Sequence, residues 1–207
     1  MPDSRIPEDP VAELLQVLNL KDSGENSFQG TTQWMPGGRV FGGQVLAQSL
    51  VAASATVDQD RRVHSLHSYF LRPGALDVPI DFEVDILRDG RSFSARRVQA
   101  SQESKVIFSM IASFQIPTDG VEHADKMPTG VSEPETLPSA KNLLGSFDHP
   151  VARYWANARP FDLRHEAESV YLKPATTKSN EQAVWFKPVS ELKIDGPLAQ
   201  AALAYAS

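Results

Sequence analysis

A pair of glycines in front of an apolar segment is the feature of this sequence best suited to chemistry. Gly42 and Gly43 precede Gln44 and a largely apolar, Ala-rich run over residues 45–57, which is typical of a buried helix. Glycines at a helix N-terminus leave the backbone N–H groups unobstructed, and the helix dipole adds positive potential there. Such a position can hold an oxyanion or a polarised carbonyl. The glycines could instead simply permit tight packing of a loop against the helix, and the residues alone leave both roles open.

A histidine-containing segment follows this helix. Residues 64–74 read His-Ser-Leu-His-Ser-Tyr-Phe-Leu-Arg-Pro-Gly. His64 and His67 are three residues apart, so on a strand they point to opposite faces and cannot form a two-histidine metal site. For either one, the pattern favours a buried, hydrogen-bonded histidine over a catalytic base. Tyr69 and Phe70 are predicted to lie in the core.

Arginines gather in one part of an otherwise acidic chain. Arg88 and Arg91 flank an Asp-Gly pair, which is the signal for a tight hairpin turn. A ligand that carries phosphates needs such cations, although arginines at a hairpin tip are usually only solvated. The whole group comprises Arg61, Arg62, Arg88, Arg91, Arg96 and Arg97.

Composition excludes several classes of function. The chain has 207 residues, a net charge of −6 and no cysteine. It can therefore hold one large or two small domains, and it has neither a thiolate metal site nor a cysteine nucleophile. The acidic balance argues against general nucleic-acid binding. We expect no signal peptide and no membrane span, and the sequence contains no phosphate-binding Gly-Lys-Ser/Thr loop and no Gly-x-Ser-x-Gly elbow.

Hydrophobic periodicity predicts an α+β architecture, with one long helix against an antiparallel meander. The predicted helices cover residues 10–20 with Asp9 as the cap, 43–57, and 197–205 with Asp195 as the cap. A strand and a turn are expected in 27–37, followed by strands at 63–72, 79–88, 92–101 and 106–115. The proline-rich stretch 117–160 is predicted to be a linker with one short helix, around 140–145 or 151–158. Further strands are expected at 161–166, 169–172 and 182–186.

Four motifs in fixed order carry a resemblance to a known family. They are Phe-Gly-Gly-Gln at 41–44, the segment 64–74, Leu-Arg-Asp-Gly-Arg-Ser-Phe-Ser-Ala-Arg-Arg-Val at 87–98, and Ala-Ser-Phe-Gln at 112–115. Together they resemble the acyl-CoA thioesterase II family, whose members contain two hotdog domains. The resemblance implies a hotdog fold, in which a long central helix is wrapped by an antiparallel sheet. It also implies a homo-oligomer formed through the hotdog sheets, located in the cytoplasm and active in fatty acid metabolism.

The same resemblance implies the reaction and the residues that bind the substrate. Activated water would hydrolyse the thioester of a fatty acyl-CoA, giving free fatty acid and CoA, with no metal or cofactor. The implied substrate-binding residues are Gly42, Gly43, Gln44, His67, Tyr69, Arg88 and Arg91. An enoyl-CoA hydratase would need a histidine and an acid at the helix, and the surroundings of residues 41–44 supply neither. A non-catalytic acyl-CoA-binding or assembly module is the other alternative.

The resemblance also predicts a domain plan. We expect an N-terminal extension over 1–27, a first hotdog domain over 28–117, a linker over 118–160, and an incomplete second hotdog domain over 161–207. A Leu-Ala-Gln triplet at 46–48 recurs at 198–200 and fits two copies of one unit. The family's catalytic aspartate is expected directly after Ser207, so no catalytic residue is carried over to this chain. Residues 1–207 alone are expected to be inactive and poorly stable.

Overall fold

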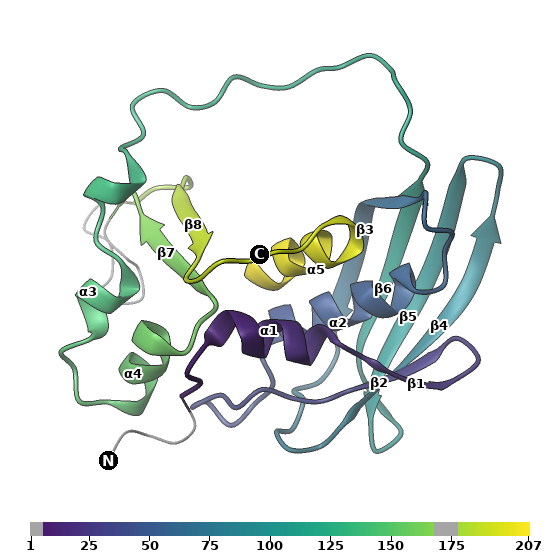
Figure 1. The fold of residues 1–207 in the computed structure, drawn as a ribbon, viewed down its shortest axis with the longest axis horizontal. Coiled ribbons are helices and arrows are strands. Elements are labelled where there is room, and N and C mark those ends of the chain that lie inside the picture. The colour runs from purple at the N-terminus through teal and green to yellow at the C-terminus, as the bar shows by residue number, and fades with distance from the viewer. Residues whose placement is uncertain (1–5, 168–177) are drawn as a thin grey trace. The chain divides into compact units, whose positions relative to one another are not determined.

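The computed structural model describes residues 6–167 and 178–207 (Figure 1). The chain divides into two compact units. The large unit combines Ala12–Asp119 with Lys193–Ser207, and the small unit combines Met1–Val11 with Gly120–Leu192.

A six-stranded antiparallel sheet forms most of the large unit. Its strands are β1 (Lys21–Gly24), β2 (Ser27–Gly30), β3 (Arg62–Phe70), β4 (Ile80–Asp89), β5 (Phe93–Gln102) and β6 (Lys105–Gln115). They lie in the order β1-β2-β4-β5-β6-β3, so β3 forms one edge and pairs only with β6 among the described strands. In β4 the alternating residues Ile80, Phe82 and Val84 are buried, as the period of two predicts. The predicted hairpin is confirmed, because the Gly90 N–H donates to the Phe93 carbonyl at 2.8 Å.

Helix α2 (Gly42–Ser54) lies against this sheet and is buried on most of its surface (Figure 1). Its residues Leu50 and Ala53 belong to one core cluster with Phe82, Phe108 and Phe114 of the strands. A helix that is apolar on most sides must be covered by other elements. Helix α1 (Pro10–Leu18) precedes the sheet, and the Asp9 carboxylate accepts a hydrogen bond from the Val11 N–H at 2.9 Å. The predicted cap of α1 is thereby confirmed.

Helix α5 (Gly196–Ala206) packs beside α2, although the two helices are about 150 residues apart in the chain (Figure 1). Ala201, Ala202 and Tyr205 are buried, whereas Leu198 and Leu203 stay exposed. Helix α5 is therefore covered on one side and exposed on the other. Asp195 occupies the N-cap position as predicted, but its side chain makes no capping hydrogen bond.

The small unit contains short elements only. They are the 3₁₀ turn η1 (Pro134–Thr136), α3 (Ala140–Leu144), α4 (Pro150–Asn157), and the antiparallel pair β7 (Phe161–His165) and β8 (Val184–Pro188). Both helix positions that the sequence offered as alternatives are occupied, by α3 and by α4. The predicted strands at 161–166 and 182–186 are confirmed as β7 and β8, and the strand predicted at 169–172 lies outside the described residues.

Arg96 fastens the β4–β5 hairpin to the end of α2. Its side chain is 1% exposed. Its Nε donates to Thr56 Oγ1 at 2.9 Å, and its Nη2 donates to the Thr56 carbonyl and to Asp89 Oδ1, both at 2.8 Å. The pKa of Asp89 is held below its ordinary value by the hydrogen bonds from Ser94 and from Arg96. The Arg96 side chain therefore stabilises the fold and is not available to a ligand. Nothing in the sequence distinguishes it from its neighbour Arg97, whose side chain is exposed.

We predict that Arg96→Met lowers the free energy of unfolding by about 3 kcal/mol, because it removes the ion pair with Asp89 and the hydrogen bonds to Thr56 from a buried position. Arg97→Met is the matched control. Arg97 forms a half-exposed ion pair with Asp85 at 2.7 Å, and its loss costs less than about 1 kcal/mol. Urea unfolding of both variants measures the difference. Equal losses would show that Arg96 does not hold the hairpin.

Candidate functional site

The N-terminus of α2 opens on a cavity of about 400 Å³. Phe41 is the N-cap residue, in the extended region, and its side chain makes no capping hydrogen bond. The first-turn amides of a helix have no partner within the helix, and the dipole makes this end positive. The cavity is lined by Arg39, Val40, Gly42, Val45, Phe70, Leu71, Arg72, Pro73, Gly74, Ile107 and Phe108. Two guanidinium groups therefore add positive charge at the positive end of the helix.

The two glycines at this helix end have different surroundings. A Cβ atom at Gly42 would lie 3.0 Å from Cζ of Phe70, whose side chain lines the cavity and is 59% exposed. A Cβ atom at Gly43 would lie 2.4 Å from the backbone oxygen of Tyr205 in α5. An exposed ring can move aside, but a backbone atom of a packed helix cannot. Gly43 therefore permits close packing of α2 and α5, whereas Gly42 borders the cavity.

Gln44, a predicted substrate-binding residue, is completely buried. Its Oε1 accepts from the Gln33 N–H at 3.0 Å, and its Nε2 donates to the Thr31 carbonyl at 2.8 Å and to Gln48 Oε1 at 3.1 Å. The side chain thus uses its hydrogen bonds to tie the preceding loop to α2. The structure does not bring the Gln44 amide to the cavity.

The side chains of β3 are more exposed than the sequence predicted. Tyr69 is 64% exposed and Phe70 is 59% exposed, so the prediction that both lie in the core is wrong. Their exposure follows from the position of β3 at the edge of the sheet. His64 and His67 are exposed too, which corrects the expectation of buried histidines. His64 Nε2 lies 2.8 Å from Ser113 Oγ, and the His67 ring stands edge-on to Tyr69 at 4.8 Å between centroids.

Arg88 and Arg91 are exposed and lie at the opposite end of α2 from the glycines. The Arg88 carbonyl accepts from Arg96, which also binds Thr56 just beyond the C-terminus of α2. The 13 residues of this helix put its two ends about 20 Å apart. The structure therefore does not bring these arginines to the glycine pair. Arg39 and Arg72 lie beside Gly42 instead, in the lining of the cavity. The sequence prediction missed both arginines, although Arg72 belongs to the motif at 64–74 and could have been chosen for that reason.

An apolar groove of about 340 Å³ runs beside the cavity. Its lining residues are Leu46 and Leu50 of α2, Val63, His64, Ser65 and Leu66 of β3, and Gln200, Leu203, Ala204 and Ser207 at α5. The Gln200 amide donates to the Val63 carbonyl at 2.9 Å, which holds α5 against β3. Val45 lines the cavity and the next residue, Leu46, lines the groove. One helix thus borders both spaces, a largely apolar cavity that carries two arginines and a groove whose walls are mainly apolar.

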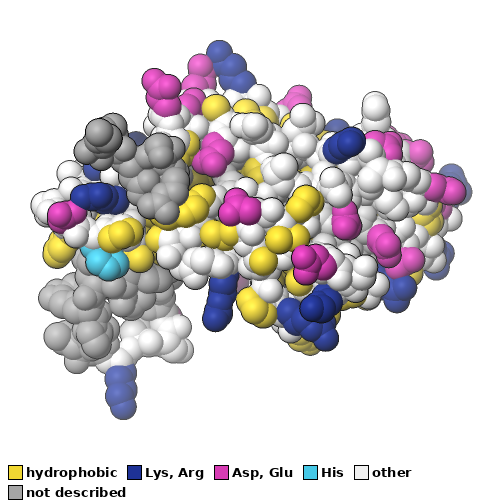
Figure 2. Space-filling view, turned by 90° about the horizontal axis from the view of Figure 1, so that it is seen from below, with side chains coloured by type: hydrophobic (Ala, Val, Ile, Leu, Met, Phe, Trp, Pro, Cys, Tyr) yellow, Lys and Arg dark blue, Asp and Glu magenta, His cyan; other side chains and the backbone are white. Residues whose placement is uncertain are grey.

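Other kinds of site find little support in the described residues. They hold no cluster of three or more His, Cys, Asp or Glu side chains that could share a metal ion. None of their helices has the length and apolar character needed to cross a membrane. On the face drawn in Figure 2, acidic and basic side chains are interspersed rather than gathered into one basic area.

Comparison with known proteins gives a consistent result. Residues 31–115 match the family described as the acyl-CoA thioesterase N-terminal domain. The chain is 38% identical to acyl-CoA thioesterase 2 of Haemophilus influenzae over 201 residues, which cover 94% of this chain and 68% of that protein. It is 43% identical to human acyl-coenzyme A thioesterase 8 over 132 residues, which cover 63% of this chain and 41% of that protein.

Solved structures agree with these relatives. The crystal structure of acyl-CoA thioesterase II TesB2 from Mycobacterium marinum matches with a TM-score of 0.72 and 38% identity, over 93% of this chain and 67% of that one. A protein of unknown function with a hot dog fold from Alicyclobacillus acidocaldarius matches with a TM-score of 0.73 at 18% identity, over 93% of this chain and 68% of that one. The second likeness concerns the fold alone.

The fold and these matches define an α+β thioesterase with the hotdog arrangement. More particularly, the chain belongs to the acyl-CoA thioesterase II family, whose reaction is the hydrolysis of acyl-CoA thioesters. The predicted family, fold and reaction are confirmed, and the comparisons give no support to a hydratase or a non-catalytic module. The chain spans about two thirds of the Haemophilus protein and less than half of the human one.

We predict that substitution of Gly43 affects the packing of α2 against α5, whereas substitution of Gly42 affects the binding of acyl-CoA in the cavity. Gly43→Ala places a methyl group against the Tyr205 backbone, and such overpacking lowers the free energy of unfolding by about 2 kcal/mol. Gly42→Ala meets only the exposed ring of Phe70, so we expect an unchanged melting temperature but weaker acyl-CoA binding. Calorimetric melting and acyl-CoA titration of both variants make the comparison. Loss of stability in Gly42→Ala alone would contradict this assignment.

Proposed function

We propose that the protein binds a fatty acyl-CoA with its thioester carbonyl at the N-terminus of α2 and its acyl chain in the apolar groove. Water attacks the carbonyl carbon, the carbon–sulfur bond breaks, and CoA leaves as the thiol after taking up a proton. The negative charge that develops on the oxygen is stabilised by the first-turn amides and the helix dipole. The observation that carries this proposal is the juxtaposition of a positive helix end and an apolar groove along α2.

The position of the water-orienting carboxylate is part of the same proposal. The family's aspartate is expected directly after Ser207, and Ser207 lines the apolar groove. Two residues earlier, the backbone oxygen of Tyr205 lies against Gly43. A carboxylate that continues α5 would therefore be close to the helix end that polarises the carbonyl. This geometry supports a site shared by the last turn of α5 and the first turn of α2.

The other predicted binding residues lie outside the two spaces that this proposal uses. His67 and Tyr69 form one exposed pair on β3 and line neither the cavity nor the groove, so the proposal gives them no contact with the acyl chain or the thioester. Arg39 and Arg72 are better placed than Arg88 and Arg91 to meet negative charge near Gly42. Arg88 and Arg91 could contact a CoA phosphate only where a second copy or a further domain brings a substrate to the hairpin.

The edge of the sheet supports an oligomer. A strand at a sheet edge presents unpaired N–H and C=O groups, and β3 also carries the exposed apolar residues Leu66, Tyr69 and Phe70. We propose that β3 pairs with a strand of another hotdog domain and so extends the sheet. A place in the cytoplasm and in fatty acid metabolism belongs to this proposal, and it fits a chain without cysteines.

We predict that the proposed groove sets the preference for acyl-chain length. Leu66→Gln makes one wall of the groove polar, so kcat/KM for long-chain acyl-CoA falls by about tenfold while that for short-chain acyl-CoA changes little. Leu87→Gln is the control, because Leu87 is exposed on the β4–β5 hairpin, outside the groove. Hydrolysis of a ladder of saturated acyl-CoAs gives the measurement.

The assay is run on residues 1–207 and on the whole open reading frame that contains them. We expect hydrolysis by the whole reading frame and none by residues 1–207 alone, because the proposed carboxylate lies beyond Ser207. Binding of acyl-CoA without turnover by the whole reading frame would favour the non-catalytic module. An equal effect of Leu66→Gln on every chain length would refute the role of the groove.

A further inference from the structure

Two arginines without a carboxylate partner line the cavity beside the N-terminus of α2. Arg39 and Arg72 contribute two positive charges, and no Asp or Glu is among the described residues that line this cavity. Neither guanidinium forms an ion pair within residues 6–167 and 178–207. In a chain whose net charge is −6, two uncompensated cations at one cavity indicate a site for a negatively charged ligand.

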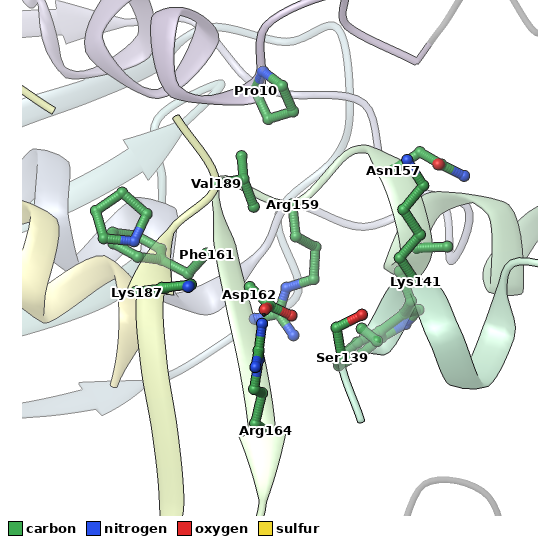
Figure 3. Close-up of a pocket in the computed structure, with 14 residues that line it drawn as sticks. Pro10, Ser139, Lys141, Asn157, Arg159, Phe161, Asp162, Arg164, Lys187 and Val189 are labelled. Atoms are coloured by element: carbon green, nitrogen blue, oxygen red, sulfur yellow. Dashed lines mark hydrogen bonds and ion pairs between the residues drawn. The ribbon is translucent and has the colours of Figure 1, made fainter. Parts of the chain in front are cut away.

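The cavity of the small unit differs in this respect (Figure 3). There Arg164 binds Asp162 at 2.9 Å and Glu135 at 2.8 Å, and Lys187 binds the same Glu135 at 2.6 Å. Figure 3 shows Asp162 beside Arg164 in the lining. Carboxylates of the protein thus already neutralise these cations, so a bound anion would have to compete with them.

Backbone contacts hold the two arginines of the α2 cavity on neighbouring loops. Arg39 belongs to the loop before α2, and Arg72 belongs to the loop after β3. Arg39 pairs with Ala75 in an isolated antiparallel bridge, and the Val40 N–H donates to the Gly74 carbonyl at 3.0 Å. The two loops therefore lie side by side, and the cations that they carry border one space.

The loop after β3 is also tied to the sheet. Gln102 is 6% exposed; its amide accepts from the Ala75 N–H at 2.8 Å and donates to the Ala75 and Val78 carbonyls at 2.9 and 2.7 Å. Arg72 Nη1 donates to the Val106 carbonyl at 2.7 Å. A guanidinium has several N–H donors, so this bond orients Arg72 and leaves donors for a ligand. Groups that are already ordered lose little entropy when a ligand binds.

The rest of the cavity suits an uncharged chain. Val45, Ile107 and Phe108 give it a mainly apolar lining, and its volume of about 400 Å³ is within the range of pockets that hold small organic ligands. An acyl-CoA carries its acyl chain on one side of the thioester and its pantetheine arm on the other. Because the proposed function places the acyl chain in the groove, the cavity is left for the arm. The far end of that arm is bonded to the 5′-diphosphate of CoA.

We propose that Arg39 and Arg72 bind the 5′-diphosphate of CoA while the pantetheine arm lies in this cavity, an inference that rests on the proposed function. Both arginines are exposed, so they meet the diphosphate at the solvent side of the cavity. The planar guanidinium can donate parallel N–H bonds to phosphate oxygens. The substrate is then held at two points, by the α2 amides at its carbonyl and by the arginines beyond the arm. The arginines contact no reacting atom, so they act on substrate binding and not on bond cleavage.

Kinetics of the whole reading frame with three thioesters of the same acyl chain test this proposal. Acyl-CoA and acyl-3′-dephospho-CoA both contain the 5′-diphosphate, whereas acyl-pantetheine contains no phosphate. We expect Arg39→Gln and Arg72→Gln each to raise KM for the first two thioesters by about tenfold, the effect of losing one charge-assisted hydrogen bond. We expect kcat to stay unchanged, and KM for acyl-pantetheine to stay unchanged as well.

The control variant removes the same charge from another place in the large unit. Arg97→Gln takes away a half-exposed arginine of β5 that is paired with Asp85, and it should leave all three KM values unchanged. Arg39→Lys and Arg72→Lys keep the charge but lose the planar fork, so they should raise KM for acyl-CoA by a smaller factor. Melting curves identify any glutamine variant that is unfolded, and the lysine variant at that position then provides the comparison.

Isothermal titration separates this proposal from the proposed reaction, because CoA, 3′-dephospho-CoA and inorganic phosphate bind without hydrolysis. We expect both glutamine variants to weaken CoA and 3′-dephospho-CoA alike. The proposal is overturned if the variants weaken CoA but not 3′-dephospho-CoA, if inorganic phosphate binds as tightly as CoA, or if Arg97→Gln has the same effect. Hydrolysis of acyl-CoA with equal KM in wild type and variants would overturn it too, yet leave the proposed function standing. CoA binding that both variants weaken, without hydrolysis of any acyl-CoA, would instead refute the proposed function and leave the arginines assigned.

Discussion

The close contact between α2 and α5 is the constraint on which the large unit depends. At Gly43 the two helices approach so closely that a single added carbon would lie 2.4 Å from the Tyr205 backbone oxygen. The Tyr205 ring packs edge-on against Phe41 at 5.1 Å, so the same residue of α5 contacts both the N-cap residue and the first turn of α2. Residues far apart in the chain therefore define one helix end. Because a backbone contact allows little adjustment, it fixes how α5 packs against the first turn of α2, the turn that also borders the cavity at Gly42.

Hydrogen bonds between buried polar side chains fix the position of α5 along α2. The Tyr205 hydroxyl donates to Gln33 Oε1 at 2.7 Å, and the Gln33 N–H in turn donates to Gln44 Oε1. Gln48 continues the network and donates to the Val17 carbonyl at the end of α1 at 2.9 Å. Apolar packing alone would tolerate small shifts of α5 along α2, whereas a misplaced hydrogen bond in the core leaves a buried group unpaired. The network thus connects α1, α2 and α5 in one register, and it explains why a glutamine follows the two glycines.

Periodicity and turn chemistry predict most of the fold, because they are local. The alternation in residues 80–86, the Asp-Gly hairpin and the apolar run after Gly43 each locate their element within a few residues. Whether a side chain is exposed depends instead on tertiary structure, which no local pattern reveals. Tyr69 and Phe70 have the composition of a core strand, and only the order of strands in the sheet shows that β3 lies at an edge. The candidate site at the glycine pair is likewise predicted from a local motif and stays a prediction. The arginines of the cavity could not be predicted, because only the tertiary fold brings Arg39 and Arg72 to the same cavity as Gly42.

The arginines show how position decides function in this fold. Arg96 and Arg97 are adjacent in sequence, yet the first is buried at the C-terminal end of α2 and the second is half exposed on the other face of β5. At the C-terminal end, the helix dipole and the Thr56 carbonyl are negative, so a cation there completes the structure. At the N-terminal end the dipole is positive, so Arg39 and Arg72 add to a charge that is already uncompensated. A cation at the C-terminal end of α2 is therefore part of the fold, whereas the two arginines at the N-terminal end add positive charge to the cavity where we propose that the thioester binds.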